Sequence, residues 1–215
     1  TGYLWFTVNS GNIERVTLSS GKPTAKTAFT APLATGTRSY TLQYADNKVV
    51  FTKGGYSSSG YTAQDVYKGV ISGSSITWTK VGVKSYTPVV TAFTLCDNDL
   101  LVYAKTKTQL ALYNMTTGAE IVAWTPFGIE STQTYIYFNL NAVVNSNKTA
   151  TLYMYVPGVG VAQYTITSQA AEEPVANLTA TCVKEEDMAD PNINKAGRQN
   201  ACLTWEANPA WGAQP

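Results

Sequence analysis

Three observations predict an all-β fold built from about four units of four short antiparallel strands. Short runs rich in Val, Thr and Tyr alternate apolar with polar residues, clusters of Asp, Asn, Gly and Thr separate these runs, and the arrangement recurs along the chain. Such runs are typical of half-buried strands, and such clusters are typical of turns. The clearest unit lies between Pro88 and Phe127. Its predicted strands are Val89–Leu95, Leu100–Ala104, Gln109–Thr116 and Glu120–Trp124.

The units repeat with a spacing of 45 to 52 residues when their third strands are aligned. Gly21, Gly73 and Gly118 close the third strands of the first three units, and Tyr164 occupies in the fourth the position of Tyr113 in the third. A period of this length with strands throughout predicts a β-propeller, in which each four-stranded sheet is one blade. A β-sandwich of generic hairpins is the alternative, but the fixed phase of the strands favours the propeller.

In this rhythm of strands, residues 1–169 resemble the large group of secreted propellers with loosely patterned blades. The first unit opens at its second strand, Leu4–Phe6, and the last stops at its third, so the first and last blades are incomplete. Closed propellers commonly complete their last blade with a strand from the start of the domain. The resemblance therefore implies the C-terminal part of a larger propeller, completed by upstream blades or by another chain.

A second domain is predicted at residues 175–215, after a linker at 170–174. Val175–Cys182 and Ala201–Ala207 resemble the first two strands of a fibronectin type III domain, including the Leu-Thr-Trp that ends at Trp205. The resemblance implies an incomplete β-sandwich with Trp205 in its core. The polar insert Val183–Asn200 is interpreted as a solvated loop, because its acidic residues do not follow the spacing of a calcium loop.

The same resemblance implies a disulfide between Cys182 and Cys202. One cysteine ends the first strand and the other opens the second, so antiparallel pairing of the two strands brings them face to face. The bond would close a loop of about 20 residues. Two reduced cysteines in a cytosolic protein are the competing interpretation, and Cys96 is left as a free thiol in either case.

Composition excludes several classes of function. The net charge is +1 and charged residues make up 13%, so we expect no nucleic-acid partner, and no apolar run is long enough for a membrane span. The chain has no histidine, which removes Ser-His-Asp, Cys-His and histidine-based zinc chemistry. We expect no metal and no cofactor, and whether the protein is an enzyme stays open, with non-catalytic function favoured.

Ligand binding is predicted on the face where propeller loops gather around the central channel. These loops join second to third strands and connect successive blades. Aromatic rings beside positive charges suit a sugar or an acidic peptide, whereas ordinary solvated loop residues are the plainer interpretation. The candidate binding residues are Tyr56, Tyr61, Lys84, Tyr86, Lys105, Lys107 and Phe127.

Two functions follow from these expectations. The first is a non-catalytic extracellular binding or scaffold module that recognises protein or glycan through the loop face. The alternative is that the chain is part of a carbohydrate-active hydrolase or lyase, and that its active site is completed by the missing blades. No catalytic residue is assigned, because Asp65, Asp97, Asp99 and Glu130 do not fall at matching positions of successive units. The resemblance implies a secreted or cell-surface protein, bacterial rather than eukaryotic.

Overall fold

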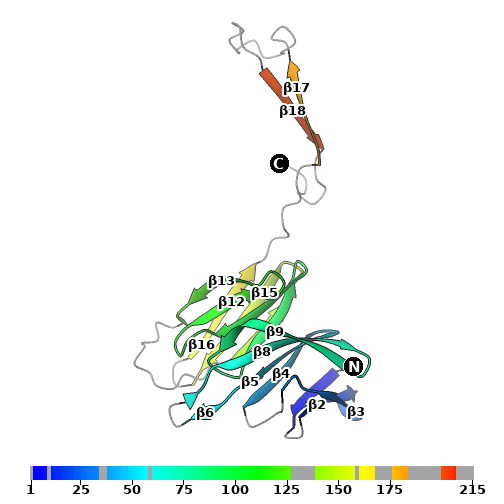
Figure 1. The fold of residues 1–215 in the computed structure, drawn as a ribbon, viewed down its shortest axis with the longest axis vertical. Helices are drawn as coiled ribbons and strands as arrows, with labels where there is room; N and C mark the ends of the chain where they lie inside the picture. Colours follow the sequence, from blue (N-terminus) through cyan, green and yellow to red (C-terminus); the bar gives the residue numbers. More distant parts are fainter. Residues whose placement is uncertain are drawn as a thin grey trace. The chain divides into compact units, whose positions relative to one another are not determined.

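The chain folds into two compact units, Thr1–Ala170 and Ala171–Pro215, each described here by itself. The structure is a computed structural model (Figure 1). It describes residues 2–8, 11–33, 38–57, 60–126, 139–157, 160–167, 176–183 and 200–206. The predicted linker at 170–174 and most of the polar insert lie outside these ranges.

Four antiparallel sheets of three or four strands, together with one separate two-stranded hairpin, make up the described part of the first unit. In each of the four sheets, neighbouring strands follow one another in order along the chain. The first sheet contains β1 (Gly2–Thr7), β2 (Asn12–Ser19) and β3 (Lys22–Thr30). The second contains β4 (Ser39–Ala45), β5 (Lys48–Lys53), β8 (Gln64–Ser72) and β9 (Ser75–Ser85). The third contains β10 (Thr91–Leu95), β11 (Asn98–Ala104), β12 (Leu110–Asn114) and β13 (Ala119–Trp124). The fourth contains β14 (Asn139–Val144), β15 (Thr149–Val156) and β16 (Gly160–Thr167).

The second strands of the two central sheets, β5 and β11, are buried on both faces. Along β5, Val50 packs with the third sheet and Phe51 with the first. Along β11, Leu101 packs with the second sheet and Val102 with the fourth. Because successive strand residues point to opposite faces, a strand covered on both sides needs a continuous apolar run rather than alternation. The runs Val49-Val50-Phe51 and Leu100-Leu101-Val102 meet this requirement.

Several tight turns contain Gly or Asp in a left-handed backbone conformation. Gly21, Gly73 and Gly118 all have positive φ and lie in the turns that lead into the last strand of each of the first three sheets. Cys96 and Asp97, in the turn between β10 and β11, also have positive φ, 46° and 60°. Left-handed backbone favours glycine because a Cβ is crowded there, and Asp tolerates it better than most residues.

The second unit shows two strands, β17 (Ala176–Val183) and β18 (Asn200–Glu206), paired antiparallel. Their register places Cys182 opposite Ala201 and Cys202 opposite Thr181. The two cysteines are therefore one residue out of the direct opposition on which the predicted disulfide depends. Counting thiols tests the bridge, as set out in the Discussion.

The predicted all-β class is confirmed, with four antiparallel sheets in the first unit. No closed barrel or closed propeller is detected among the described residues, so the propeller and the sandwich stay predictions. Within those residues, no helix has the length and apolar character needed to cross a membrane.

Candidate ligand-binding surface

Longer connections gather at one end of the first unit, which we call the loop end. The backbone N–H of Ala31, after β3, donates to the Gly11 carbonyl at 3.1 Å, beside the connection from β1 to β2. The N–H of Tyr86, after β9, donates to the Ala104 carbonyl at 2.7 Å, beside the connection from β11 to β12. At this end, two connections between sheets are therefore hydrogen-bonded to neighbouring connections within a sheet.

Tyr56 is the most exposed aromatic ring that the structure describes among the predicted binding residues. It lies in a two-stranded hairpin, β6 (Tyr56–Ser57) and β7 (Gly60–Tyr61), within the connection from β5 to β8. Tyr61 is paired directly opposite Tyr56. The guanidinium carbon of Arg38 lies 4.4 Å from the centre of the Tyr56 ring, a cation–π contact. The hairpin thus presents an aromatic ring and a positive charge together.

Lys84 is exposed and ion-paired. Its Nζ lies 3.4 Å from Asp65 Oδ1, and Lys80 Nζ lies 3.1 Å from the same oxygen. Partial burial works to raise the pKa of Asp65, but the hydrogen bond from Lys80 and the charges of both lysines outweigh it, so the pKa lies below its usual value. Asp65 is therefore held as a carboxylate at the start of β8.

Lys105 belongs to a second small charge group at the loop end. Its Nζ donates to Glu120 Oε1 at 2.7 Å, and the Tyr103 hydroxyl donates to Glu120 Oε2 at 3.3 Å. The hydrogen bond from Lys105 lowers the pKa of Glu120, while burial and the charge of Glu120 raise the pKa of Tyr103 to about 12. Lys107 is exposed in the same loop.

One predicted residue, Tyr86, does not join this exposed set. Tyr86 is half-buried and packs against the core cluster shared by the third and fourth sheets. Phe127 lies outside the described residues, and for Tyr61 the structure gives the backbone position only. The described loop end therefore offers Tyr56 with Arg38, Lys84 with Asp65, and Lys105 with Glu120.

Asp99, which the sequence did not single out as a site, joins the second and third sheets at the end opposite the loop end. Its side chain is 3% exposed, and its two oxygens lie 2.8 Å from Lys48 Nζ and 2.6 Å from Lys68 Nζ. The Thr94 hydroxyl also donates to it at 2.9 Å. Burial works to raise the pKa of Asp99, but the hydrogen bonds from the lysines and Thr94 hold it below its usual value. The pKa of Tyr44 is raised mainly by burial of its ring and also by the nearby Asp99 carboxylate.

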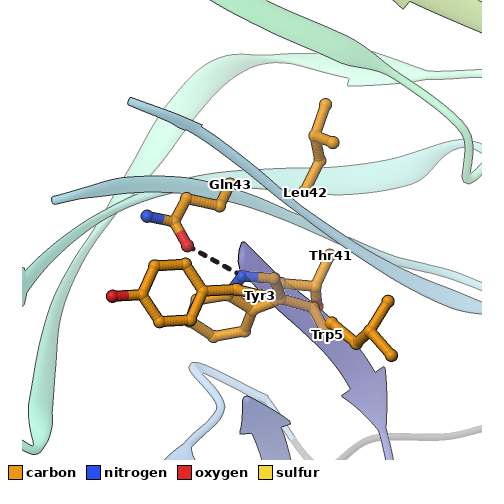
Figure 2. Close-up of a pocket in the computed structure, with 6 residues that line it drawn as sticks. Tyr3, Trp5, Thr41, Leu42 and Gln43 are labelled. Atoms are coloured by element: carbon orange, nitrogen blue, oxygen red, sulfur yellow. Dashed lines mark hydrogen bonds between the residues drawn. The ribbon is translucent and has the colours of Figure 1, made fainter. Parts of the chain in front are cut away.

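A groove of about 360 Å³ between β1 and β4 was also missed by the sequence analysis (Figure 2). The Trp5 indole N–H donates to Gln43 Oε1 at 2.9 Å and ties the two strands together. The Gln43 amide donates in turn to the carbonyls of Ala45 and Asp46. None of the predicted binding residues lines this groove. Its lining residues are Tyr3, Leu4, Trp5, Thr41, Leu42 and Gln43.

The sequence signal nearest to this groove is the aromatic run at the start of the chain. Tyr3, Trp5 and Phe29 surround the Arg15 guanidinium carbon at 4.7, 5.8 and 5.2 Å from their ring centres. The sequence of a strand that is paired along only one edge has the same alternation of apolar and polar residues as that of any half-buried strand. The pairing of β1 with a single neighbour had to come from the structure.

No protein-family model matches this sequence, and no curated protein matches it either.

Proposed function

We propose that the first unit is a non-catalytic binding or scaffold module that recognises a protein or glycan ligand through its loop end. The proposal includes the propeller interpretation, in which the four sheets are successive blades of a larger ring and the second unit acts as a spacer. It also includes a secreted or cell-surface location, in keeping with the resemblance to secreted propellers.

The observation that carries the proposal is the exposed Tyr56 ring under the Arg38 guanidinium. Tyrosine and arginine are the side chains most enriched at the energetic centres of interfaces, because they combine a large flat surface with polar groups. The ion-paired Lys84 and Lys105 sit at the same end of the sheets and supply polar groups around this centre. Such an arrangement suits a ligand that spreads over a surface.

The hydrolase or lyase alternative gains nothing from Asp65, Asp99 or Glu120. A general acid needs a raised pKa, so that its carboxyl group keeps a proton near neutral pH. The pKa values of Asp65, Asp99 and Glu120 all lie below their usual values, because each carboxylate is paired with at least one lysine. These groups are fixed as charge partners rather than poised to transfer protons.

The test is a binding screen of residues 1–215 against arrayed neutral and acidic oligosaccharides and against an acidic peptide. For a probe that binds, we expect Tyr56→Ala to weaken affinity by at least about tenfold, the loss typical of an aromatic anchor. The double variant Lys105→Ala/Lys107→Ala is expected to weaken binding of acidic probes more than that of neutral ones.

Tyr153→Ala is the control, because Tyr153 is also exposed, 41% against 46% for Tyr56, but lies in the middle of β15. Affinity that falls equally in both tyrosine variants would remove the loop end from consideration. Wild-type protein that binds no probe of either class would count against ligand recognition by this unit.

A further inference from the structure

The charge of +1 for the whole chain conceals opposite charges on its two units. Twelve lysines and arginines against seven aspartates and glutamates lie in residues 1–170, so the first unit carries +5. The remaining three basic and seven acidic residues give the second unit a charge of −4. A charge balance of this kind creates a field around a unit that attracts partners of the opposite sign. The first unit is therefore suited to an anionic ligand.

The excess of positive charge lies at the loop end. The basic residues of the connections and strand ends there are Arg38, Lys53, Lys84, Lys105 and Lys107. The acidic residues of the same segments are Asp65 and Glu130, of which Glu130 lies outside the described residues. At the opposite end, basic residues are matched by acidic ones, Lys22, Lys48 and Lys148 by Asp46, Asp97 and Asp99. The two ends of the sheets therefore differ in charge, and the loop end is the basic one.

Three lysines of the second sheet are neighbours of Asp65. Lys80 and Lys84 both pair with its carboxylate. Lys53 lies directly opposite Asp65 on the other side, in β5, and directly opposed residues of paired strands project from the same face. Within the described residues, Lys53 forms no ion pair. One carboxylate thus serves three ammonium groups, and this part of the loop end keeps an uncompensated positive charge.

The third sheet adds a second basic group in the connection from β11 to β12. Lys105 is paired with Glu120, whereas Lys107 is exposed and forms no ion pair with any residue that the structure describes. A hydrogen bond of 2.7 Å joins the chain just after β9 to the end of β11, so this connection lies beside the strand end that carries Lys84. Basic residues of two neighbouring sheets are therefore next to each other at the loop end.

The chemistry of these residues selects a carboxylate that is carried on a sugar ring. The lysines already hold the carboxylates of Asp65 and Glu120, so they suit carboxylate groups of a ligand. The exposed Tyr56 ring, with the Arg38 guanidinium against it, offers a flat apolar surface beside a positive charge. A uronic acid fits both features, because its rigid ring has an apolar C–H face and bears a carboxylate. An acidic peptide carries its carboxylates on flexible stems without such a face, and ordering those stems costs conformational entropy.

From these observations we infer that the loop end binds an acidic polysaccharide built from uronic acid units. The inference rests on the proposed function, which it deepens by naming the class of ligand. The repeated carboxylates of the polysaccharide compensate the positive charge of both lysine groups, while one of its rings stacks on Tyr56. Electrostatic complementarity of this kind speeds association and discriminates against neutral and cationic partners.

The test compares three probes by titration calorimetry with residues 1–215, in a buffer free of divalent cations. The probes are an oligogalacturonate, its methyl ester, and a poly-glutamate of the same charge. The methyl ester keeps the rings and linkages but lacks the charges, whereas the poly-glutamate keeps the charges but lacks the rings. We expect the oligogalacturonate to bind at least about tenfold more tightly than either control probe. Its affinity should also fall as salt is raised, because salt screens exposed charges.

Two double variants locate the binding. Lys84→Gln/Lys107→Gln removes two charges from the loop end and is expected to weaken oligogalacturonate binding at least about fivefold, with no change for the methyl ester. Lys22→Gln/Lys148→Gln removes the same net charge from exposed positions at the opposite end, and should bind as wild type does. Thermal melts of both variants identify a change that merely unfolds the chain. The comparison of probes uses wild-type protein alone and does not depend on either variant.

The possible failures of this inference differ from those of the proposed function. Oligogalacturonate and methyl ester that bind equally, or poly-glutamate that binds as tightly, would overturn the inference. If Tyr56→Ala still weakens that binding, the proposed function stands. Equal losses in the two lysine variants would show that overall charge attracts the probe, and would also overturn the inference. The same holds if the oligogalacturonate shows no saturable binding up to about 1 mM. The proposed function would then depend on the neutral oligosaccharides and the acidic peptide of its own screen.

Discussion

The carboxylate of Asp99 joins two sheets, with Lys48 and Lys68 from the second sheet on its two oxygens. Replacing it by asparagine keeps the shape but leaves two lysines facing each other without their counter-charge. Removing one member of a buried ion pair typically costs 3–5 kcal/mol, and the partly solvated lysines place Asp99→Asn near the lower end. We expect a loss of about 3 kcal/mol in the free energy of unfolding, measured by urea denaturation.

Asp97→Asn is the matched control for this prediction. Asp97 is exposed in the turn just before β11, and asparagine tolerates its left-handed backbone, so the variant removes an equal charge without removing a buried pair. Equal destabilisation by the two substitutions would contradict the role given to the Asp99 carboxylate.

The contribution of Asp99 to stability should also depend on pH with a definite sign. Its pKa in the fold lies below the value of about 3.9 expected for the unfolded chain, so folding favours the ionised form. The stabilisation is fully present above the unfolded pKa and is lost as pH falls through the folded one. The difference in unfolding free energy between wild type and Asp99→Asn should therefore be constant above about pH 5 and shrink below about pH 4. A difference that grows in acid would reverse the assignment.

Gly69 is required by the ring stacked over it. A Cβ at this position would lie 2.6 Å from Trp78 Cζ3 and 2.6 Å from Ile76 Cγ2, closer than real contacts allow. Both neighbours pack with the core cluster shared by the first and second sheets, so they cannot simply move away. We expect Gly69→Ala to destabilise the fold by about 1–3 kcal/mol in chemical denaturation. Gly2→Ala, whose Cβ would meet only Leu18 at 3.9 Å, should change stability little.

Residue type and spacing predicted which loop residues are exposed better than they predicted which side chains form ion pairs. The exposed position of Tyr56 follows from a Gly- and Ser-rich connection, which sequence displays directly. The pairing of Lys105 with Glu120 joins a loop to a neighbouring strand, and that of Asp99 with Lys48 joins two sheets. An ion pair between two sheets, such as that of Asp99 with Lys48, depends on how the sheets pack, and no local sequence pattern encodes that packing.

Individual strands were the best predicted elements. The third sheet contains all four predicted strands, and observed bounds such as Thr91–Leu95 against Val89–Leu95 differ by a few residues at the ends. The hairpin of β6 and β7 was not predicted, because Tyr56-Ser57 and Gly60-Tyr61 are too short for a period-two pattern and lie in a segment rich in turn residues.

Strand register was harder to predict than strand position. The residues Cys182 and Cys202 lie in two paired strands as expected, but the pairing is offset by one residue from direct opposition. The connection between these strands is long, so no tight turn fixes their register. With this register we expect alkylation under denaturing, nonreducing conditions to label three thiols per chain. One labelled thiol would instead establish the Cys182–Cys202 bridge and a register shifted by one residue.

At the scale of the whole molecule, the four sheets differ in how many of their faces are covered. The second and third sheets pack on both sides, whereas the first and fourth have one described partner sheet each. The sequence of one sheet does not predict how many sheets a complete assembly contains, because each sheet contacts only its neighbours. Sequence rhythm therefore predicts the sheets and their order but leaves ring closure to experiment.

The outer face of the fourth sheet exposes aromatic and β-branched side chains. Along β15, Leu152, Met154 and Val156 point into the core, so the alternate residues Tyr153 and Tyr155 lie on the opposite face. Val161, 68% exposed, is paired opposite Tyr155 and so shares that face. Contiguous aromatic and β-branched surface of this kind promotes association, because burying it removes apolar area from water.

We therefore expect residues 1–215 to associate in a concentration-dependent way through this face, as sedimentation velocity would show. The double variant Tyr155→Lys/Val161→Lys places two like charges at paired positions on the face and should shift the chain towards monomer. Val122→Lys is the control, because Val122 is also exposed, at 48%, but lies in β13, the outermost strand of the third sheet. A wild-type chain that stays monomeric with a single cooperative melt would show that the fourth sheet is stable with this face in water. That result would also remove the strongest physical reason for expecting further sheets beyond it.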